Sequence, residues 1–352
     1  MPEVVEELGL MYSHTCNIAC RHCGIESGPK NRNRMDFDFA VDVIRQAARL
    51  RPPIRTLVFT GGEPLVHRRE IEALVEIAAD EGLSTRIVTN GFWARDLKRG
   101  RRLLHRLRLA GLNELTFSAD KFHLEFQPAA VLRNALDLAF ELRLGVSVTF
   151  VHSDPEEDAL DAFARLYDLP RERLARQEDY DPEIAAAALA LGEPPRIWVT
   201  AGRLVAMGRA AEHPGEHLLS PLTDFGYGAC HAVANKPVVY PDGTLQACCC
   251  AGGKLSTFHA GNLRRQDLAS ACAAMTERSH YRFINRFGPR RLYEVMTAAR
   301  GSDPHESHAS ICDVCVRATQ GVAPAVVDGV LDAWALDRLV RPACAASPKP
   351  VP

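Results

Sequence analysis

The chain is predicted to be an α/β protein with parallel strands, and two features of its 352 residues support this fold class. Short β-branched and apolar segments alternate with segments of helical periodicity over residues 55–167. The apolar segments also end in glycine or polar residues. Strand and helix units repeated in this way imply parallel strands joined by right-handed crossovers. With 47% hydrophobic residues the chain can bury a large core, and we expect one main domain plus a smaller one.

The individual elements follow from the same periodicities. Asp36 or Asp38 is expected to cap the first helix. Pro52-Pro53 stops that helix, and Gly82 ends the second. Strands are predicted at 8–12, 55–60, 84–89, 113–118, 146–151 and 196–200. Helices are predicted at 39–48, 71–82, 95–108, 129–144 and 156–167. No helix or strand is predicted for the acidic, alanine-rich segment 168–195.

Glycine and polar residues gather where the predicted strands end. A glycine turn at 61–64 follows the second strand, and Asn90 follows the third. Ser118 and Asp120 follow the fourth. Such a sheet could close into a partial barrel or open into a doubly wound sheet, and in either case polar groups meet beyond the carboxyl ends of the strands. Because several polar residues follow strands that end at the same edge of the sheet, an active site is predicted at that edge.

Three cysteines, Cys16, Cys20 and Cys23, share one short segment with the spacing CxxxCxxC, directly after the apolar run 8–12. Their thiolates can converge on one soft-metal site without help from distant sequence. A cubane has four irons, so three local cysteines leave one iron open to a ligand that is not protein. A zinc site or a disulfide is the alternative, although zinc sites usually pair their ligands two and two.

This segment resembles the cluster loop of the radical S-adenosylmethionine (radical SAM) superfamily, in which amino and carboxylate groups of S-adenosylmethionine (SAM) chelate the open iron. Gly61-Gly62-Glu63-Pro64 resembles the family's GGEP, whose backbone and glutamate hold the SAM amino group. Glycine lets the backbone approach the ligand closely, and a carboxylate suits an ammonium group. The resemblance implies a partial parallel (β/α)6 barrel that binds SAM and a 4Fe-4S cluster.

The resemblance also implies further contacts to SAM or substrate. Asn90, Ser118 and Asp120 stand at strand tips where radical SAM enzymes contact ribose, methionine or substrate. Arg209, within a Gly-Arg-Ala tripeptide, resembles the sixth-strand GRA that approaches SAM. Asparagine and aspartate also serve as turn residues, which is the alternative for those two positions. His123 is a candidate substrate contact, and a structural histidine is the alternative.

A second module is expected after the barrel, so that the domains are 1–220 and 221–352. We expect this module to contain a hairpin, short helices and a C-terminal helix. A turn at 241–243 allows the hairpin to bring its first two cysteines together. Four cysteines resemble the auxiliary-cluster ligands of twitch and SPASM domains: Cys230, Cys248, Cys312 and Cys315.

One auxiliary 4Fe-4S cluster is expected from these four ligands. A SPASM domain continues with further cysteines after Cys315, yet Gly321 and Ala325 stand at the corresponding positions, so a twitch domain fits better. A zinc knuckle that uses the same cysteines is the alternative.

Cys249 and Cys250 leave the ligand register open, because either could replace Cys248. They are also candidate catalytic residues. A redox-neutral epimerase must return a hydrogen atom to the substrate radical, and a thiol beside the auxiliary cluster could give it. An oxidase or crosslinker would instead lose an electron to the auxiliary cluster, and we favour this second reaction type because four cysteine ligands leave no vacant iron.

The resemblance implies a radical SAM oxidoreductase that cleaves SAM reductively to a 5'-deoxyadenosyl radical and abstracts hydrogen from an unactivated carbon. Peptide oxidation, crosslinking or epimerisation in natural-product biosynthesis is the expected reaction. The alternatives are a sugar or small-metabolite substrate, and a non-enzymatic iron-sulfur or zinc-binding module. An electron donor such as flavodoxin or ferredoxin is implied. Because only fifteen residues precede Cys16, a peptide substrate would need direct docking or a separate recognition protein.

Composition argues against other classes of function. A formal charge of -2 gives no electrostatic case for a nucleic-acid partner, and the basic stretch 95–108 is expected to be a solvated helix face, with a docking surface for an acidic peptide as the alternative. No apolar run reaches the length of a membrane span, and the N-terminus lacks a signal peptide, so a cytoplasmic location is expected. Eleven unevenly spaced cysteines favour metal binding over a disulfide framework.

Overall fold

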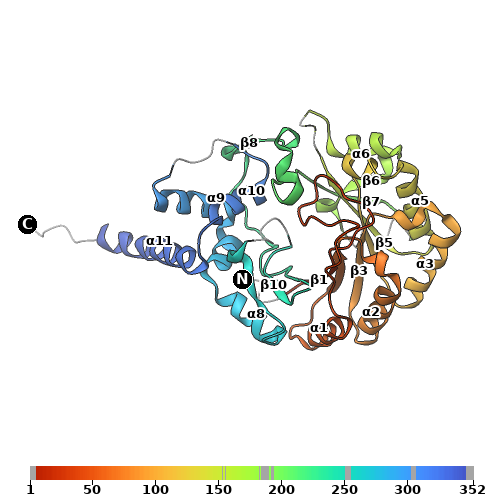
Figure 1. The fold of residues 1–352 in the computed structure, drawn as a ribbon. Coiled ribbons are helices and arrows are strands. Elements are labelled where there is room, and N and C mark those ends of the chain that lie inside the picture. Colours follow the sequence, from red (N-terminus) through yellow and green to blue (C-terminus); the bar gives the residue numbers. More distant parts are fainter. Residues whose placement is uncertain are drawn as a thin grey trace, which may run out of the picture.

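The computed structural model describes residues 5–345 apart from 153, 155, 182, 184–189, 192–193, 250–254 and 303–306. It confirms the α/β fold class with a sheet of parallel strands at its centre (Figure 1). Each predicted strand of this sheet is present, and the third has the predicted bounds. In spatial order the central strands are β1 (Glu7–Ser13), β2 (Thr56–Gly61), β3 (Ser84–Thr89), β4 (Glu114–Ser118), β5 (Gly145–Val151) and β7 (Ile197–Gly202).

The helices that connect these strands lie along the outside of the sheet (Figure 1). They are α1 (Phe37–Arg49), α2 (Arg68–Asp80), α3 (Leu97–Leu109), α5 (Ala129–Glu141) and α6 (Ala159–Tyr167). Of the two predicted caps of the first helix, Asp36 is confirmed, because its carboxylate accepts a hydrogen bond from the Phe39 amide. Connecting helices on one face distinguish a partial barrel from a doubly wound sheet, in which helices cover both faces.

The connecting helices bury an apolar stripe and keep their charges outside, as α3 illustrates. Three leucines of α3 are buried, and each such burial contributes about 1.5–3 kcal/mol. On its outer face, Arg101 forms an ion pair with Glu141 of α5, and Arg106 forms one with Glu72 of α2. The predicted solvated face of α3 is therefore partly used to join neighbouring helices.

The structure adds elements that the periodicity does not predict. β6 (Leu174–Arg176) pairs with the outer side of β7 and is too short to produce a periodic pattern. α9 (Ser279–Arg300) and α11 (Pro324–Ala345) have 22 residues each; α9 consists of two shorter helices that meet at a kink, and α11 is the expected C-terminal helix. Gly288 and Pro289 are typical of a helix stop, but the chain kinks at Gly288 and continues as helix.

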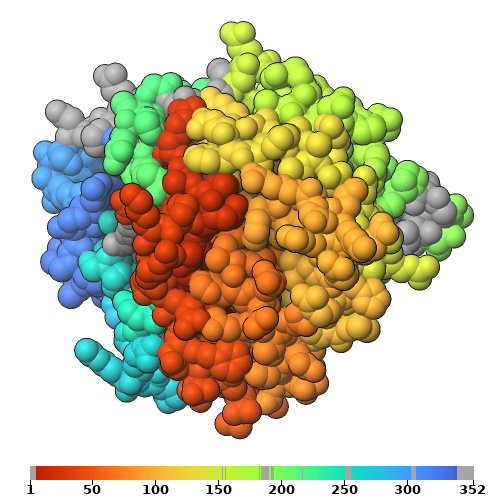
Figure 2. Space-filling model, turned by 45° about the vertical axis from the view of Figure 1, so that its right-hand side comes forward, coloured from red at the N-terminus to blue at the C-terminus, as the bar shows by residue number. Residues whose placement is uncertain are grey.

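The predicted hairpin is confirmed, and it extends the central sheet. β9 (Val238–Val239) pairs with β10 (Thr244–Gln246), and β10 pairs with β11 (His259–Asn262). β9 also runs parallel to β1, so one ten-stranded sheet passes from the barrel into the C-terminal part. Figure 2 shows this part, in cyan and blue, flanking the N-terminal residues in red. The domain boundary after residue 220 stays a prediction.

The remaining elements surround this junction. α8 (Leu268–Glu277) and α10 (Ile311–Thr319) lie with α9 and α11 on the C-terminal side (Figure 1). β8 (Ser220–Pro221) and β12 (Ser307–His308) form a separate two-stranded sheet. Within the described part of the chain, no single helix has the length and apolarity to cross a bilayer; α10 and the start of α11 reach that threshold only as a pair bent by 102°.

The junction between β1 and β9 depends on a glycine. A Cβ on Gly9 would lie 2.9 Å from Cγ2 of Val238 in the paired strand. We predict that Gly9→Val lowers the free energy of unfolding by about 1–3 kcal/mol, because the β-branched neighbour has little freedom to move. Urea denaturation measures the change.

The matched control is Gly202→Val at the end of β7, where an added Cβ meets no described atom within 4 Å. Adding Val238→Ala to the Gly9→Val variant should recover part of the loss. Equal stability of the Gly9 and Gly202 variants would contradict the importance of this contact.

Candidate functional site

The three N-terminal cysteines lie in one closed loop at the carboxyl end of β1. Bridges between Ser13 and Arg34 and between Thr15 and Gly28 hold the two arms of the loop together. The Cys16 amide donates to the Gly28 carbonyl at 3.2 Å. We call residues 14–34 the cluster loop. It brings its cysteines to one cavity of about 220 Å³, lined among others by Cys16, Cys20 and Cys23, none of which forms a disulfide.

The glycine turn after β2 packs directly on the cluster loop. A Cβ on Gly61 would lie 2.3 Å from the Ser13 carbonyl oxygen, and one on Gly62 would lie 2.2 Å from that of Thr15. The Gly62 amide donates to Ser13 at 2.6 Å, and the Glu63 amide donates to Thr15 at 2.9 Å. Both glycines line the cavity. The close approach seen in the structure is to the cluster loop, whereas close approach to the ligand was the reason expected from the sequence.

Glu63 ties the tips of two strands together. Its buried carboxylate accepts hydrogen bonds from the Asn90 amide at 2.7 Å, from Thr89 Oγ1 at 2.9 Å and from the Leu65 amide at 3.1 Å. Pro64 then begins the short 3-10 helix η1 (Pro64–His67). Burial raises the pKa of Glu63 to about 7, against the effect of these donors. A contact from this carboxylate to SAM stays a prediction.

Asn90 connects the tip of β3 to the cluster loop. Its Nδ2 donates to Asn17 Oδ1 at 2.9 Å and lies 3.8 Å from Cys16 Sγ. Its Oδ1 accepts from the Phe92 amide, and its carbonyl accepts from Gln127 Nε2 at 2.6 Å. These bonds fix the amide beside the first cysteine. Its predicted contact with SAM is untested, but its position at the cavity agrees with that role.

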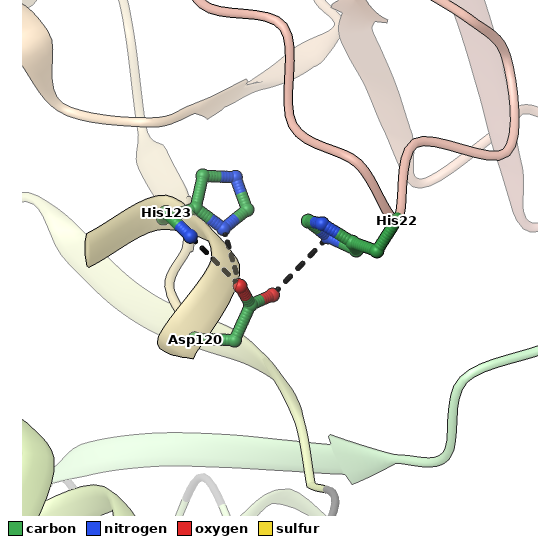
Figure 3. Close-up of side chains that lie close together, drawn as sticks. All are labelled: His22, Asp120 and His123. Atoms are coloured by element: carbon green, nitrogen blue, oxygen red, sulfur yellow. Dashed lines mark hydrogen bonds and ion pairs between the residues drawn. The ribbon is translucent and has the colours of Figure 1, made fainter. Parts of the chain in front are cut away.

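The tip of β4 carries an ion-pair cluster with two histidines (Figure 3). Asp120 caps α4 (Lys121–Leu124), and its Oδ1 accepts from the amides of Phe122 and His123. The same oxygen lies 2.9 Å from His123 Nδ1, while Oδ2 lies 3.3 Å from His22 Nε2. Ser118 lines the cavity beside them. The sequence pattern indicates Asp120 and His123 but not His22, although His22 lies between two cluster-loop cysteines.

Asp120 and His123 stabilise each other's charged forms. Burial by itself would raise the pKa of Asp120, but the charge of His123 and hydrogen bonds from both histidines hold it well below its usual range. Burial would likewise lower the pKa of His123, and the Asp120 carboxylate overrides this and raises it to about 10. The carboxylate and the His123 imidazolium are therefore both charged at neutral pH.

Arg209 holds the cluster loop from the side opposite the glycine turn. It lies in the 3-10 helix η5 (Gly208–Glu212) that follows β7. Its Nε donates to the Cys20 carbonyl at 2.8 Å, and its Nη2 donates to the Ser27 carbonyl at 2.7 Å. Its amide donates to the Cys23 carbonyl at 3.2 Å. The side chain also lines the cavity, where its predicted SAM contact stays a prediction.

The cavity fits an iron-sulfur cluster with an added polar ligand. Burial raises the pKa of the Cys16 thiol to about 12, so this sulfur becomes a thiolate only if a metal replaces its proton. Two buried polar atoms at the cavity, His22 Nδ1 and Ser27 Oγ, have no hydrogen-bond partner in the described part of the chain. A bound polar molecule could satisfy both.

The segments that carry the auxiliary cysteines lie near α9. The Cys230 amide donates to the Ile284 carbonyl of α9 at 3.2 Å. Cys248 follows β10 and lies within electrostatic range of Tyr281 on α9. Cys312 and Cys315 lie on α10, which packs against α9. Four predicted ligands thus come from elements that meet at one helix.

The two candidate catalytic cysteines lie beside this group in the sequence. Cys249 is exposed, and it lies within electrostatic range of Tyr240. Cys250 falls outside the described residues. The choice of the auxiliary ligand among Cys248, Cys249 and Cys250 therefore stays open.

Comparison with known proteins bears on the barrel half of the chain. Residues 10–166 match the family profile of the radical SAM superfamily. This matching part covers somewhat less than half of the chain. It includes the cluster loop, the glycine turn, Asn90 and the Asp120 cluster, so the resemblance read from the motifs is confirmed at the level of the superfamily.

Proteins that are similar in sequence to this part have different named roles. The candidate peptide biosynthesis protein YydG of Bacillus subtilis (strain 168) is 27% identical over 122 residues, which is 35% of this chain and 38% of that protein. Molybdenum cofactor biosynthesis protein 1 of Mus musculus is 32% identical over 116 residues, which is 32% of this chain and 17% of that protein. The chain thus matches well under half the length of these relatives.

Likeness in fold extends over nearly the whole chain. The solved structure "Native anSMEcpe with bound AdoMet" superposes with a TM-score of 0.50, covering 95% of this chain and 98% of that one at 12% identity. At this identity the likeness concerns the fold alone. It includes the C-terminal side as well as the radical SAM barrel.

The contact between the glycine turn and the cluster loop gives a direct test of the site's construction. In Gly62→Ala the new methyl group would lie 2.2 Å from a backbone oxygen of Thr15, which must move. We predict that amide hydrogen exchange in residues 14–34 becomes about tenfold faster, equivalent to roughly 1.4 kcal/mol of local stability. Mass spectrometry of the exchanged protein measures this.

Gly215→Ala is the control, because its Cβ meets no described atom within 4 Å. Exchange that stays at the wild-type rate in the Gly62 variant would show that the loop does not depend on this contact.

Proposed function

We propose that the protein is a radical SAM enzyme that holds a 4Fe-4S cluster on Cys16, Cys20 and Cys23 and binds SAM at its open iron. The observation that carries the proposal is the cavity itself, where three cysteines without a fourth meet the glycine turn inside the part of the chain that matches the radical SAM superfamily. When bound, the reduced cluster supplies the electron that cleaves SAM to a 5'-deoxyadenosyl radical, which abstracts hydrogen from the substrate.

The chain's own residues would bind, orient and enclose these groups. The three thiolates would hold iron at the cavity that they line. The proposed SAM contacts are Gly61, Gly62, Glu63, Pro64, Asn90, Ser118, Asp120 and Arg209. All of them except Glu63 and Pro64 line the cavity, and an ionised Glu63 carboxylate beside it would supply the negative charge that an ammonium group requires.

An auxiliary 4Fe-4S cluster is proposed on Cys230, Cys248, Cys312 and Cys315. Support comes from the meeting of their elements around α9 and from the likeness in fold to anSMEcpe over the C-terminal side. Four cysteine ligands leave no open iron, so this cluster suits electron transfer. A zinc knuckle that uses the same cysteines is the alternative.

A peptide is the proposed substrate, with oxidation or crosslinking favoured over epimerisation. Support comes from the relative YydG, which is named as a candidate peptide biosynthesis protein. A flavodoxin or ferredoxin would supply electrons, and a separate protein could present the peptide. A small-metabolite substrate is the second candidate, because another relative is named for molybdenum cofactor biosynthesis. If epimerisation occurs, Cys249 and Cys250 are the proposed hydrogen donors.

The iron bound by each of the two clusters can be measured separately. Anaerobically reconstituted protein should bind about eight irons, four per cluster, and form 5'-deoxyadenosine with dithionite and SAM. Replacing Cys16, Cys20 and Cys23 together by alanine should remove about half of the iron and all of the 5'-deoxyadenosine.

The matched variant Cys312→Ala with Cys315→Ala should also lose about half of the iron, but it should still cleave SAM. A wild-type preparation that is stable with zinc alone and develops no iron-sulfur absorption would contradict the proposal.

The proposed effect of the Glu63 charge on SAM binding can be tested separately from the hydrogen bonds that Glu63 forms within the protein. Glu63→Gln keeps the shape of the side chain and removes its charge, so SAM affinity should fall about tenfold or more while iron content is unchanged. Equilibrium dialysis with the reconstituted protein measures the affinity. Glu72→Gln, on the surface of α2, is the control. Wild-type affinity in the Glu63 variant would remove this carboxylate from the SAM site.

A further inference from the structure

A second cavity, of about 830 Å³, lies where α9 and α11 meet the start of β1. Ligand pockets in proteins typically have volumes of about 300–1,000 Å³. Phe283 and Phe287 of α9 and Leu331 of α11 contribute apolar side chains to its lining. This cavity and the one at the cluster loop share no described lining residue.

The second cavity lies at the opposite end of β1 from the cluster loop. Glu6, which lines it, directly precedes β1, whereas the cluster loop follows the carboxyl end of that strand. A strand rises about 3.3 Å per residue, so β1 separates the two places by about 20 Å. A molecule in the second cavity therefore lies away from the proposed site of hydrogen abstraction.

Two arginines of α9 bring positive charge to the second cavity. Arg282 and Arg286 line it and are exposed. They are four residues apart, so their side chains are neighbours on one helix face, where like charges repel each other. Glu6 and Asp332 line the same cavity, yet within the described part of the chain neither arginine forms an ion pair. Both guanidinium groups can therefore bind a carboxylate from another molecule.

Two asparagines of the second cavity carry buried oxygen atoms without a donor. Asn235 is 3% exposed, and Asn285 lies on α9. Among the described residues, Oδ1 of neither side chain has a hydrogen-bond partner. Asn285 Nδ2 donates to the Val233 carbonyl at 3.0 Å, which fixes the orientation of that amide and leaves its oxygen as an acceptor. Because buried polar groups are nearly always hydrogen-bonded, these oxygens indicate a bound molecule with N–H donors.

We propose that the second cavity docks an acidic segment of the peptide substrate, away from the residue that reacts. This inference rests on the proposed function, and in particular on its peptide substrate. Backbone N–H groups of the segment would donate to Asn235 and Asn285, and its carboxylate would bind Arg282 and Arg286. Its apolar side chains would pack on Phe283 and its apolar neighbours. A peptide combines these three kinds of group, whereas a small anion supplies one of them.

The position of the second cavity also limits which part of the peptide can dock there. An extended chain spans at most about 3.3–3.6 Å per residue. About six residues or more must therefore separate the docked segment from the residue that reacts at the cluster loop.

The test uses full-length, anaerobically reconstituted protein and a pool of capped pentapeptides. Each peptide has glutamate at its centre and glycine, leucine, valine or phenylalanine at the other positions. Equilibrium dialysis with mass spectrometry should show binding that is about tenfold stronger than that of the matched pool with glutamine at the centre. A pool with N-methylated backbones should also bind more weakly, because it cannot donate to the asparagine oxygens. Wild-type protein that does not distinguish the glutamate pool from the glutamine pool would overturn the inference.

Substitutions locate the binding on α9. The double variant Arg282→Gln with Arg286→Gln should lose the preference for glutamate. The control is Arg102→Gln with Arg108→Gln on the exposed face of α3, the alternative docking surface, and it should bind as wild type does. An unchanged preference in the α9 variant, or its loss in the α3 variant alone, would overturn the inference. A dimer that dissociates in the α9 variant would assign the cavity to a second copy of the chain and would also overturn it.

Two further measurements separate this inference from the proposed function. Both double variants should keep wild-type iron content and form 5'-deoxyadenosine without substrate, because their residues lie outside the cavity at the cluster loop. A photoreactive leucine analogue in the glutamate pool should crosslink to residues 279–300 of α9, and crosslinks confined to residues 14–34 would overturn the inference. Wild-type protein that does not cleave SAM would contradict the proposed function instead.

Discussion

The candidate site depends on how closely two backbone segments approach each other. The amides of Gly62 and Glu63 donate to the carbonyls of Ser13 and Thr15, and this approach leaves no room for a Cβ at Gly62. The cluster loop is thereby fixed to the tip of β2 on one side. Arg209 holds the other side through carbonyls within the loop. A loop with three cysteines is thus rigid before any metal binds, which lowers the entropic cost of binding one.

Two carboxylates at the site are buried, and each accepts hydrogen bonds from neighbouring groups. Glu63 is buried with donors from the β3 tip, whereas Asp120 is buried with the imidazolium of His123. The first carboxylate keeps a raised pKa and the second a lowered one, although both are almost inaccessible to water. The difference lies in the partner, because neutral donors offset desolvation less than an opposite charge does. Two carboxylates on one rim can therefore have different roles.

Local sequence patterns predicted the repeating strands and helices. They did not predict the features that depend on long-range contacts. β3 and the hairpin of β9 and β10 follow from alternation and turn residues. Parallel pairing of β9 with β1 joins segments more than two hundred residues apart, which no local pattern encodes. At the site, the motif cysteines and Asp120 were found from spacing and strand position. His22 was missed because its importance arises only when the cluster loop folds over the β4 tip.

In the proposed site three cysteines leave one iron open to SAM. The test is pulsed magnetic resonance of the reduced N-terminal cluster in protein mixed with SAM that carries 15N in its amino group. We expect a nitrogen coupling strong enough to require a direct bond between that amino group and iron. SAM that binds without such a coupling, or a fourth protein ligand in its place, would show that the iron is not open to SAM.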